Sequence, residues 1–505
     1  VKITLQRKAR LVADGHKVPE TSKENTYSSV PSRDSVRLFF LIAALNDLDV
    51  LSADIQNAYL TAPLNDAKCR YYVVACEAYG FPKEFWGRPA KVVRALYGLP
   101  VAGASFRSHL ARHLRELGYR PSKADPDVHL RPAVKENGDL YYQMMIAYVD
   151  DLLCCGVDPR TQMQMVADEF TLKDGTVEEP TLYLGADIEK VVIPESDDPG
   201  KTRWAMSSTN YTKKAVAEVE RELGTAAYGF TYLPKGVKTP LSSDYRPELD
   251  PTPELDDKKQ NYYQGLVGVL RWICELGRLD ILMPVSLMSR YLAQAWEGHL
   301  NQVFHVFAYL KHHERSKLVF DDTLPQYNEA RFHKCDWSEF YPDAEEVLPP
   351  DMPEPRGKSV VMTCFVDADH AGCKETRRSH TGVLIFVNRA PILWFSKRQS
   401  TVETSTFGSE IVALRIAIEM IQGLRYKLRM FGVPIDGPCD TFCDNESVVK
   451  NVSRPESPLK KKHNAIAYHK ARESIAAGIL RIAKEDGKTN IADILTKLLK
   501  GPILR

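Results

Sequence analysis

Two adjacent aspartates, Asp150 and Asp151, lie between two apolar runs, YYQMMIAYV before them and LLCCGV after them. Each run has the length and the aliphatic and aromatic content of a buried strand. Desolvating two neighbouring carboxylates costs several kcal/mol unless a partner compensates their charge. The pattern therefore predicts a hairpin of buried strands whose tip is either an ordinary solvated turn or a site for a cation.

A second segment, VLSADIQNAYL, favours the cation site. Here Asp54 ends another apolar, strand-like stretch and a short polar break follows it. Three carboxylates at the ends of neighbouring strands can hold two divalent cations about 4 Å apart, the arrangement used for in-line phosphoryl transfer. Oxygen ligands of this kind suit Mg²⁺, which keeps several waters and shares its other positions with substrate phosphates. Asp54, Asp150 and Asp151 are thus a candidate metal site.

Two proline-punctuated acidic stretches, 240–259 and 336–355, read as linkers because neither carries enough apolar residues to fold alone. They divide the 505 residues into blocks of about 1–240, 260–335 and 356–505. The first block mixes apolar strands with a helix predicted over 32–49, and is of the α+β class. The middle block has apolar residues at helical spacing and predicts a helical bundle.

The last block predicts strands at 359–369, 381–387 and 391–398, a helix at 409–432, a strand at 439–445 and a helix at 490–499. This order indicates an α/β layer arrangement. It would bring together four acids that, taken singly, would be expected to face solvent: Asp367, Glu410, Asp444 and Asp493. Four convergent carboxylates could hold two Mg²⁺ ions for a hydrolytic reaction with water as the nucleophile.

Composition limits the remaining function classes. A chain with 44% hydrophobic residues, 26% charged residues and no apolar run of about 20 residues is expected to be globular and not to span a membrane. The first 17 residues lack a secretion signal, and the absence of an initial Met suggests a fragment or a processed product. Ten scattered cysteines predict reduced core thiols.

The formal net charge is only +1, so nucleic-acid binding would need local basic patches. One candidate is 451–505, which holds 12 Lys and Arg against 5 Asp and Glu, with 458–475 as its most basic part. Such a stretch could contact nucleic-acid backbone in a salt-sensitive way. A solvated helix face is the alternative. His463 is a candidate general acid or base whose role is left open.

The segment YVDD at 148–151, together with DIQNAYL at 54–60, resembles the reverse transcriptase of copia-type LTR retrotransposons. Further matching segments follow in the family's order and extend the resemblance over nearly the whole chain: KARLVADGH (8–16), ALYGL (95–99), YLGADI (183–188), YYQGLVGVLRW (262–272), DILMPVSLMSRYL (280–292) and ADILTK (492–497). The last block resembles the RNase H domain of the same elements, also through ETRRSHTGVLIF (375–386) and LWFSKRQSTVETS (393–405).

The resemblance implies an α+β multidomain fold. It has a right-hand polymerase of fingers, palm and thumb, followed by an RNase H-like α/β domain. Fingers and palm would occupy 1–240, a helical thumb or connection with an acidic linker 241–345, and the RNase H-like domain 346–505. The implied function is an RNA- and DNA-dependent DNA polymerase with ribonuclease H activity on RNA–DNA hybrids, serving retrotransposon replication.

The resemblance also implies roles for single residues. Asp54, Asp150 and Asp151 would be the catalytic, metal-binding carboxylates of the polymerase; Asp367, Glu410, Asp444 and Asp493 would be those of the nuclease. Tyr59 would exclude a 2′-hydroxyl from the incoming nucleotide, with core packing as the alternative. Lys8 and Arg10 would lie near the triphosphate, or else in a solvated loop. Asp369 would at most support the metal ligands.

The implied cofactor is Mg²⁺, two ions per site, or Mn²⁺ in its place. The implied partners are an RNA template, a DNA primer, RNA–DNA hybrids and dNTPs, with dimerisation left open and no membrane. The implied location is intracellular, in cytoplasmic virus-like particles or the nucleus.

Two departures from the family pattern keep other functions open. Pro100, Val101 and Ala104 replace the usual Lys, Gln and Arg after LYGL, and the Gln position normally lies near the nucleotide. Gly408 replaces the earlier of two glutamates before the last block's helix. A degenerate copy that binds nucleic acid with only RNase H or no activity is therefore one alternative. A structural protein without catalysis is another, although all seven carboxylates are present.

Overall fold

The fold is described from a computed structural model of the chain. It describes residues 11–15, 26–64, 71–173, 175–193, 200–225, 232–459 and 462–499. The chain divides into two compact units: the first comprises Val1–Phe39 and Asn46–Pro180, the second Phe40–Leu45 and Thr181–Arg505. Among the described helices, none is both long enough and apolar enough to cross a membrane.

The first unit is built on a five-stranded antiparallel sheet of order β1-β7-β6-β5-β4. Its strands are β1 (Asp49–Asp54), β4 (Arg120–Pro121), β5 (Val128–Val134), β6 (Leu140–Tyr148) and β7 (Asp151–Gly156). The hairpin predicted around Asp150 is confirmed as β6 and β7, and the strand predicted before Asp54 is confirmed as β1. Strand β7, which lies between β1 and β6, is almost wholly buried, as its unbroken apolar sequence predicts.

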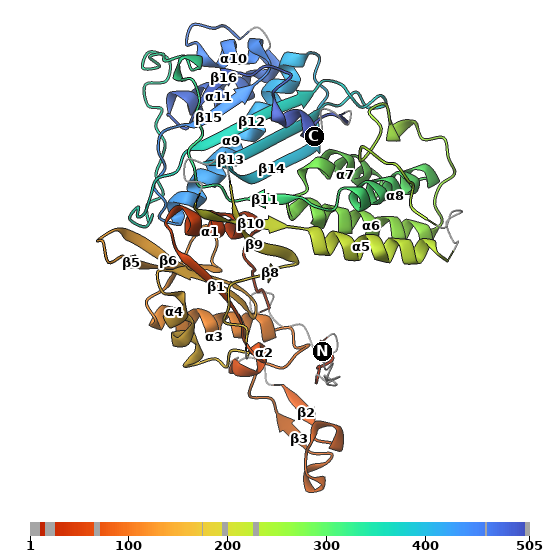
Figure 1. Cartoon of the computed structure of the whole chain (residues 1–505), viewed down its shortest axis with the longest axis vertical. Helices are drawn as coiled ribbons and strands as arrows, with labels where there is room; N and C mark the ends of the chain where they lie inside the picture. Colours follow the sequence, from red (N-terminus) through yellow and green to blue (C-terminus); the bar gives the residue numbers. More distant parts are fainter. Residues whose placement is uncertain are drawn as a thin grey trace. The chain divides into compact units, whose positions relative to one another are not determined.

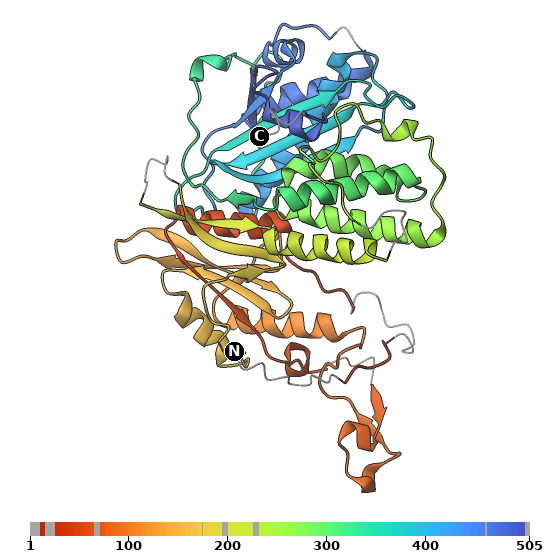
Figure 2. The same ribbon diagram turned by 45° about the vertical axis from the view of Figure 1, so that its right-hand side comes forward.

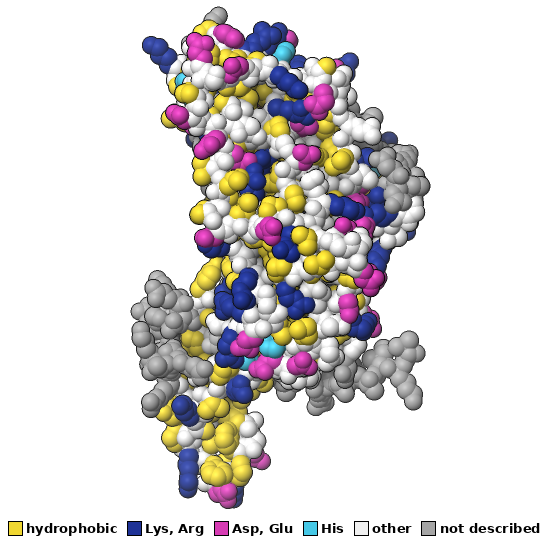
Figure 3. All heavy atoms as spheres, turned by 90° about the vertical axis from the view of Figure 1, so that its left-hand side faces the viewer, with side chains coloured by type: hydrophobic (Ala, Val, Ile, Leu, Met, Phe, Trp, Pro, Cys, Tyr) yellow, Lys and Arg dark blue, Asp and Glu magenta, His cyan; other side chains and the backbone are white. Residues whose placement is uncertain are grey.

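Three helices supply residues to the core of this unit: α2 (Ala58–Thr61), α3 (Ala102–Glu116) and α4 (Pro159–Ala167). The residues of α1 (Arg33–Leu45) are divided between the two units. Phe106, Leu110 and Leu114 recur at helical spacing along α3 and pack with Met145 of β6 and Leu152 of β7 in one core. A separate ribbon, β2 (Tyr72–Val74) with β3 (Pro89–Lys91), carries exposed apolar side chains, which Figure 3 shows at the lower end of the molecule.

The second unit contains the helices predicted for the middle block. They are α6 (Asp257–Glu275), α7 (Leu282–Met288) and α8 (Glu297–His312), joined by α5 (Thr209–Leu223), and they share one apolar core. Figure 2 shows them lying side by side. A four-stranded sheet of order β11-β10-β9-β8 accompanies them: β8 (Leu182–Tyr183), β9 (Ala186–Val192), β10 (Thr202–Ser207) and β11 (Lys317–Val319).

The C-terminal part of the second unit forms a mixed five-stranded sheet of order β14-β13-β12-β15-β16 (Figure 1). Its strands are β12 (Met362–Asp369), β13 (His380–Val387), β14 (Ala390–Arg398), β15 (Cys439–Cys443) and β16 (Leu480–Lys484). The first three run antiparallel, whereas β15 and β16 run parallel to β12. Helix α9 (Thr406–Met430) packs on β12 and β13, and α10 (Glu446–Ser453) and α11 (Ala465–Ala476) complete the layer.

Three strands, the long helix and strand β15 are confirmed in this block, but the predicted final helix over 490–499 is wrong. A short 3₁₀ turn, Ile491–Leu495, stands in its place. The Asn490 side chain holds this turn against the sheet, because it accepts from the Ala492 N–H and donates to the Val366 carbonyl of β12. The prediction also missed α10, α11 and β16. The other 3₁₀ turns are Glu77–Tyr79, Lys83–Phe85, Pro247–Leu249, Leu279–Ile281, Ser289–Tyr291, Glu329–Arg331 and Lys462–Asn464.

The acidic stretch 336–355 forms no helix or strand, as predicted, yet it is docked on the fold. Glu346 accepts two hydrogen bonds from Arg425 of α9, at 2.8 and 2.7 Å, and pairs with Arg429. Further along, Trp337 lies 5.0 Å from the guanidinium of Arg472. Charge and stacking thus replace the apolar burial that this segment lacks.

Candidate functional site

The first carboxylate cluster, Asp54, Asp150 and Asp151, lies where three strands of the first unit meet. Asp54 is the last residue of β1 and pairs directly with Asp151, the first residue of β7. Asp150 occupies the turn between β6 and β7, and its carbonyl accepts a 2.9 Å hydrogen bond from the Ile55 N–H. Strand pairing therefore brings together the three acids that the sequence predicted to converge.

The turn that carries Asp150 is strained. Val149 has φ of 58°, a left-handed conformation that a β-branched side chain rarely adopts. Such a residue costs of order 1–3 kcal/mol and persists only where surrounding contacts fix it. Val149 packs against the core of the unit, which supplies that constraint.

Charge at the first cluster is only partly compensated. Burial and the neighbouring Asp150 and Asp54 raise the pKa of Asp151 to about 6, against the opposing effect of Lys173. The Lys173 Nζ lies 3.5 Å from an Asp54 oxygen, and it is the cation that the described residues pair with this cluster. A divalent cation would relieve this repulsion, but the oxygens of Asp54, Asp150 and Asp151 do not all lie within 4.8 Å of one another, so the three side chains would have to move closer to share one ion.

Tyr59 belongs to α2 beside this cluster and is half-buried. Its ring lies 5.1 Å from that of Tyr97 and 6.2 Å from that of Phe106. Its pKa is raised by burial first and by the Asp150 charge second. Val101, at the start of α3, is 2% exposed and belongs to the core. Lys8 and Arg10 lie outside the described residues.

The second carboxylate cluster, Asp367, Glu410, Asp444 and Asp493, lies on the mixed sheet of the second unit. Asp367 is on β12, Glu410 in the second turn of α9, Asp444 directly after β15, and Asp493 on the 3₁₀ turn. Asp367, Asp444 and Asp493 each offer an oxygen within 4.8 Å of the others. Glu410 and Asp444 form a similar group with the Cys443 thiol. Within the described ranges, these are the two groups close enough to share an ion.

Burial makes the second cluster a place of unbalanced negative charge. Burial, Asp367 and Asp444 together raise the pKa of Glu410 well above its usual range, and one Glu410 oxygen, Oε2, is buried without a hydrogen-bond partner. Burial and the Asp367 charge also raise the pKa of Asp444. An orphaned carboxylate oxygen among hard oxygen donors fits a divalent cation.

Lys497 and Thr496 bind the same carboxylates, and sequence reasoning did not single them out. The Lys497 Nζ lies 2.7 Å from Asp493 Oδ1 and 3.4 Å from Asp367 Oδ2, and the Thr496 hydroxyl donates to Asp367. Burial raises the pKa of Asp493 to about 6 despite this lysine. The spacing of four residues between Asp493 and Lys497 in ADILTK was the available signal.

Other predicted residues lie to the side of this cluster. Asp369 is not part of either ion-sized group, and its carboxylate fills the space that a side chain on Gly372 would need. A Cβ on Gly408 would lie 2.6 Å from Glu403 Oε2. The Glu403 side chain therefore occupies the space that a glutamate at position 408 would need. His463 lies 3.6 Å from the same Glu403 carboxylate. The cysteines of the described part are all free, as predicted.

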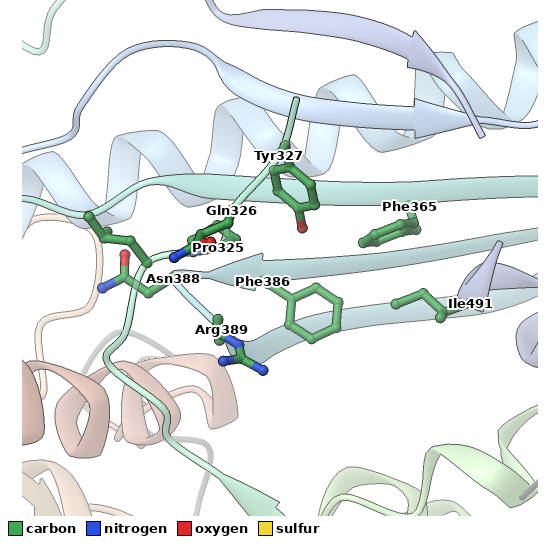
Figure 4. A pocket seen from close by; sticks show the side chains of 9 residues that line it. Pro325, Gln326, Tyr327, Phe365, Phe386, Asn388, Arg389 and Ile491 are labelled. Carbon is green, nitrogen blue, oxygen red and sulfur yellow. The ribbon is translucent and has the colours of Figure 1, made fainter. Parts of the chain in front are cut away.

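A separate hollow of about 600 Å³ lies on the same sheet (Figure 4). Phe365, Phe386 and Tyr327 line it together with Arg389, and it contains no carboxylate. Tyr327 and Phe365 pack against the buried ring of Phe442. The hollow therefore belongs to the packing of the segment before β12 on the sheet, and it offers no catalytic group.

Charge over the surface is mixed. On the face shown in Figure 3, lysine and arginine side chains are interspersed with aspartate and glutamate. This agrees with the net charge of +1 and leaves local grooves as the places where one sign of charge can gather.

The amino-terminal residues 1–197 match the family model described as reverse transcriptase (RNA-dependent DNA polymerase). The chain is 26% identical to the retrovirus-related Pol polyprotein from transposon RE1 of Arabidopsis thaliana and 24% identical to that from transposon TNT 1-94 of Nicotiana tabacum. Each match covers 97% of this chain but only 29% and 33%, respectively, of the relative. The chain thus spans about a third of the length of these curated relatives.

Solved structures similar to the chain include the N-terminal RNase H domain of a Mycobacterium tuberculosis protein, at 14% identity, and LC11-RNase H1 in complex with an RNA/DNA hybrid, at 19%. Each similarity covers 27% of this chain, with 91% and 93% of the respective solved chains, and each has a TM-score of 0.22.

Proposed function

We propose that the chain is the part of a copia-type retrotransposon Pol polyprotein that carries reverse transcriptase and RNase H, and that it polymerises DNA on RNA and DNA templates and degrades the RNA of RNA–DNA hybrids. The observation that carries this proposal is the presence of two carboxylate clusters, one in each compact unit. The relatives are about three times as long, so the proposal concerns the activities of this part alone.

For polymerisation, Asp54, Asp150 and Asp151 would hold two Mg²⁺ ions, or Mn²⁺ in their place. Ions bound in either cluster would supply the positive charge that activates the attacking oxygen and stabilises the leaving one. The β1–β7 pairing places the backbones of Asp54 and Asp151 opposite each other, and the side chains would close around the ions as these bind. Tyr59, beside Asp150, would form a wall against a 2′-hydroxyl, and Lys8 and Arg10 would contact the triphosphate.

For hydrolysis, Asp367, Glu410, Asp444 and Asp493 would hold the second pair of ions. Glu410 supports this assignment because its orphaned oxygen gains a partner only when a cation binds. Lys497 would neutralise Asp367 and Asp493 until that moment and then move aside. The four carboxylates would hold the ions that activate a water molecule for attack on the phosphodiester, and the 3′-oxygen of the RNA would leave.

We propose the corresponding organisation: a right-hand polymerase with fingers and palm in 1–240, a thumb or connection in 241–345, and a nuclease domain in 346–505. The substrates would be dNTPs with an RNA template and DNA primer, and then the resulting hybrid. We place the action inside the cell, in cytoplasmic virus-like particles or the nucleus, and leave dimer formation to measurement.

The polymerase is tested by extension of a labelled DNA primer on an RNA template with Mg²⁺ and dNTPs, with Asp150→Asn as the matched variant. We expect the chain to extend the primer and Asp150→Asn to lose at least about a hundredfold in rate while keeping hybrid affinity. Asp168→Asn, at the exposed end of α4, is the control for the loss of one surface charge.

One observation favours a second candidate, a copy that retains only hybrid cleavage. Val101 stands where relatives carry a glutamine near the nucleotide, and its apolar side chain is buried in the core. It cannot offer a polar contact to a substrate. If primers are not extended by the chain but hybrids are cut, this second candidate replaces the first.

A further inference from the structure

Two hollows of the second unit join into one groove that starts at Thr496 and Lys497, the residues that contact Asp367 and Asp493 of the second carboxylate cluster. The first, of about 340 Å³, is lined by Asp369, Thr496 and Lys497. The second, of about 710 Å³, runs between α6 and α7 on one side and the edge strand β14 on the other. Arg290 and Arg378 line both hollows, so the two are continuous.

Basic side chains dominate the far part of this groove. The second hollow is lined by five cations and a single acid, Glu275; the cations are Arg271, Arg290, Arg378, Lys397 and Arg398. No carboxylate within the described ranges forms an ion pair with any of the five. Unpaired cations on adjacent elements of a groove are the usual arrangement for an anionic ligand.

The centre of the groove shows how this charge is kept free. The Arg290 Nη2 donates to His380 Nδ1 at 2.9 Å. Because a guanidinium can only donate, His380 carries its proton on Nε2 and donates to the Ser396 hydroxyl, 2.9 Å away, which donates to the Leu495 carbonyl. A neutral imidazole thus orients Arg290 where a carboxylate would have cancelled its charge.

Two further features indicate a missing anion. The Arg290 Nε is buried without a hydrogen-bond partner. The pKa of Arg290 is lowered by burial and then by the nearby charge of Arg398, whereas a paired arginine would show the opposite shift. Among the described residues, Arg398 donates to the Cys373 sulfur, at 3.8 Å. The charge of Glu248, which lines the first hollow, opposes the effect of Arg398 on Arg290 but does not reverse it, so the two guanidinium groups lie near each other with their charges incompletely balanced.

We propose that Arg290, Arg378 and Arg398 bind a backbone phosphate of the nucleic acid whose RNA is cut at the second carboxylate cluster. This inference rests on the proposed nuclease function. It extends the surface that binds the hybrid beyond the mixed sheet to the helices α6 and α7 and to Arg290. Arginine suits this role because its planar fork matches two phosphate oxygens. A polymer is favoured over free phosphate because the cations continue along the groove, to Arg271 and Lys397 at one end and Arg246 at the other.

The test compares Arg398→Gln and Arg378→Gln with Arg315→Gln, an exposed arginine that lines neither hollow and lies outside the basic stretch 451–505. Affinity for a fluorescent RNA–DNA hybrid is measured with Ca²⁺ over a range of salt concentrations, on the full chain. We expect each groove variant to lose about tenfold in affinity, since one charge-assisted contact is removed. The slope of log K against log salt should fall by about 0.9 for each variant, and the control should match the wild type.

Further arms separate the alternatives. Arg398→Lys should keep the slope of log K against log salt, because the charge remains. When the rate of RNA cleavage is measured over a range of hybrid concentrations, the Gln variants should have a higher KM and nearly the same kcat as the wild type. Groove variants that behave like Arg315→Gln, while the wild type binds and cuts hybrids, would overturn this inference alone. A wild type that neither binds nor cuts hybrids would overturn the proposed nuclease as well. Loss of inorganic-phosphate binding with unchanged hybrid affinity would assign the groove to a small anion instead.

Discussion

At the scale of single residues, Lys497 occupies a position between two carboxylates that a bound cation would share. Its ammonium lies within 4 Å of both Asp367 and Asp493, and it is 42% exposed, so it can swing out toward solvent. Such a side chain compensates the negative charge of the second carboxylate cluster in the absence of metal and competes with a metal ion for the same oxygens.

Replacement of this lysine tests the competition. In Lys497→Met, we expect the metal-free protein to lose about 1 kcal/mol of stability, because two buried acids lose their partner. The midpoint of Mg²⁺-induced thermal stabilisation should move to lower concentration, because the competing cation is gone. Lys258→Met, an exposed lysine on α6, is the matched control. An unchanged or higher Mg²⁺ midpoint in Lys497→Met would contradict the competition.

Asp151 gives a prediction on pH. Its pKa is about 6 in the fold against an ordinary 3.8, so between these values the folded chain binds more protons than the unfolded chain. Its contribution to the free energy of unfolding therefore falls as pH rises through this window, and the loss is complete above about pH 6. Because the carboxyl is half-exposed, solvent reduces the effect to about 1 kcal/mol.

In Asp151→Asn, we therefore expect the metal-free protein to be more stable than the wild type at pH 7.5, with a smaller gain at pH 5. Melting temperatures at the two pH values without divalent cation measure this difference, and Asp158→Asn, at an exposed helix cap, serves as control. A variant that is less stable than the wild type at pH 7.5 would show that the three acids do not repel one another.

Sequence reasoning could place six of the seven carboxylates because each lies at the end of a recognisable apolar strand or near the start of a helix; Asp493 was assigned to a helix that is a 3₁₀ turn. It could not find Lys497 opposite Asp367 or Arg290 opposite His380, because those contacts join residues 130 and 90 positions apart. Only the packing of the 3₁₀ turn and of α7 against the sheet brings them together.

At the scale of elements, the acidic stretch 336–355 is held to α9 by charge. Arg425 is 4% exposed on its side chain, and its guanidinium depends on Glu346 for two hydrogen bonds. Two arginines that share one carboxylate lower the pKa of Glu346, with burial opposing them.

In Glu346→Gln, we expect a loss of about 2 kcal/mol in stability and faster proteolytic cleavage within 336–355, because Arg425 stays buried without its counter-charge. Thermal melts and limited proteolysis measure the two effects. Glu345→Gln removes the same charge at an exposed neighbour and should change neither. Equal melting temperatures and cleavage rates in the two variants would mean that the stretch is not held by this pair.

Strong periodicity decided which elements could be predicted. The apolar strands β12 to β14 and the 25-residue helix α9 were found because their patterns are long and unbroken. Strand β16, with sequence LRIAK, is short and ends in a basic residue, and its strand state depends on parallel pairing with β15. The prediction of a final helix was wrong because the Asn490 and Thr496 side chains form hydrogen bonds with β12, which hold this segment as a 3₁₀ turn.

At the scale of the whole molecule, the two carboxylate clusters lie in different compact units. Their acids come from separate sheets, and no residue is shared between them. The account therefore predicts two activities that can be removed one at a time, and this independence is its central claim.

The most direct test follows both products in one reaction, on a hybrid with labelled RNA template and labelled DNA primer, with the wild type, Asp150→Asn, Asp444→Asn and the double variant. The account predicts that Asp150→Asn stops primer extension while RNA cleavage continues, that Asp444→Asn does the reverse, and that the double variant loses both. Loss of both activities in either folded single variant would contradict two independent centres.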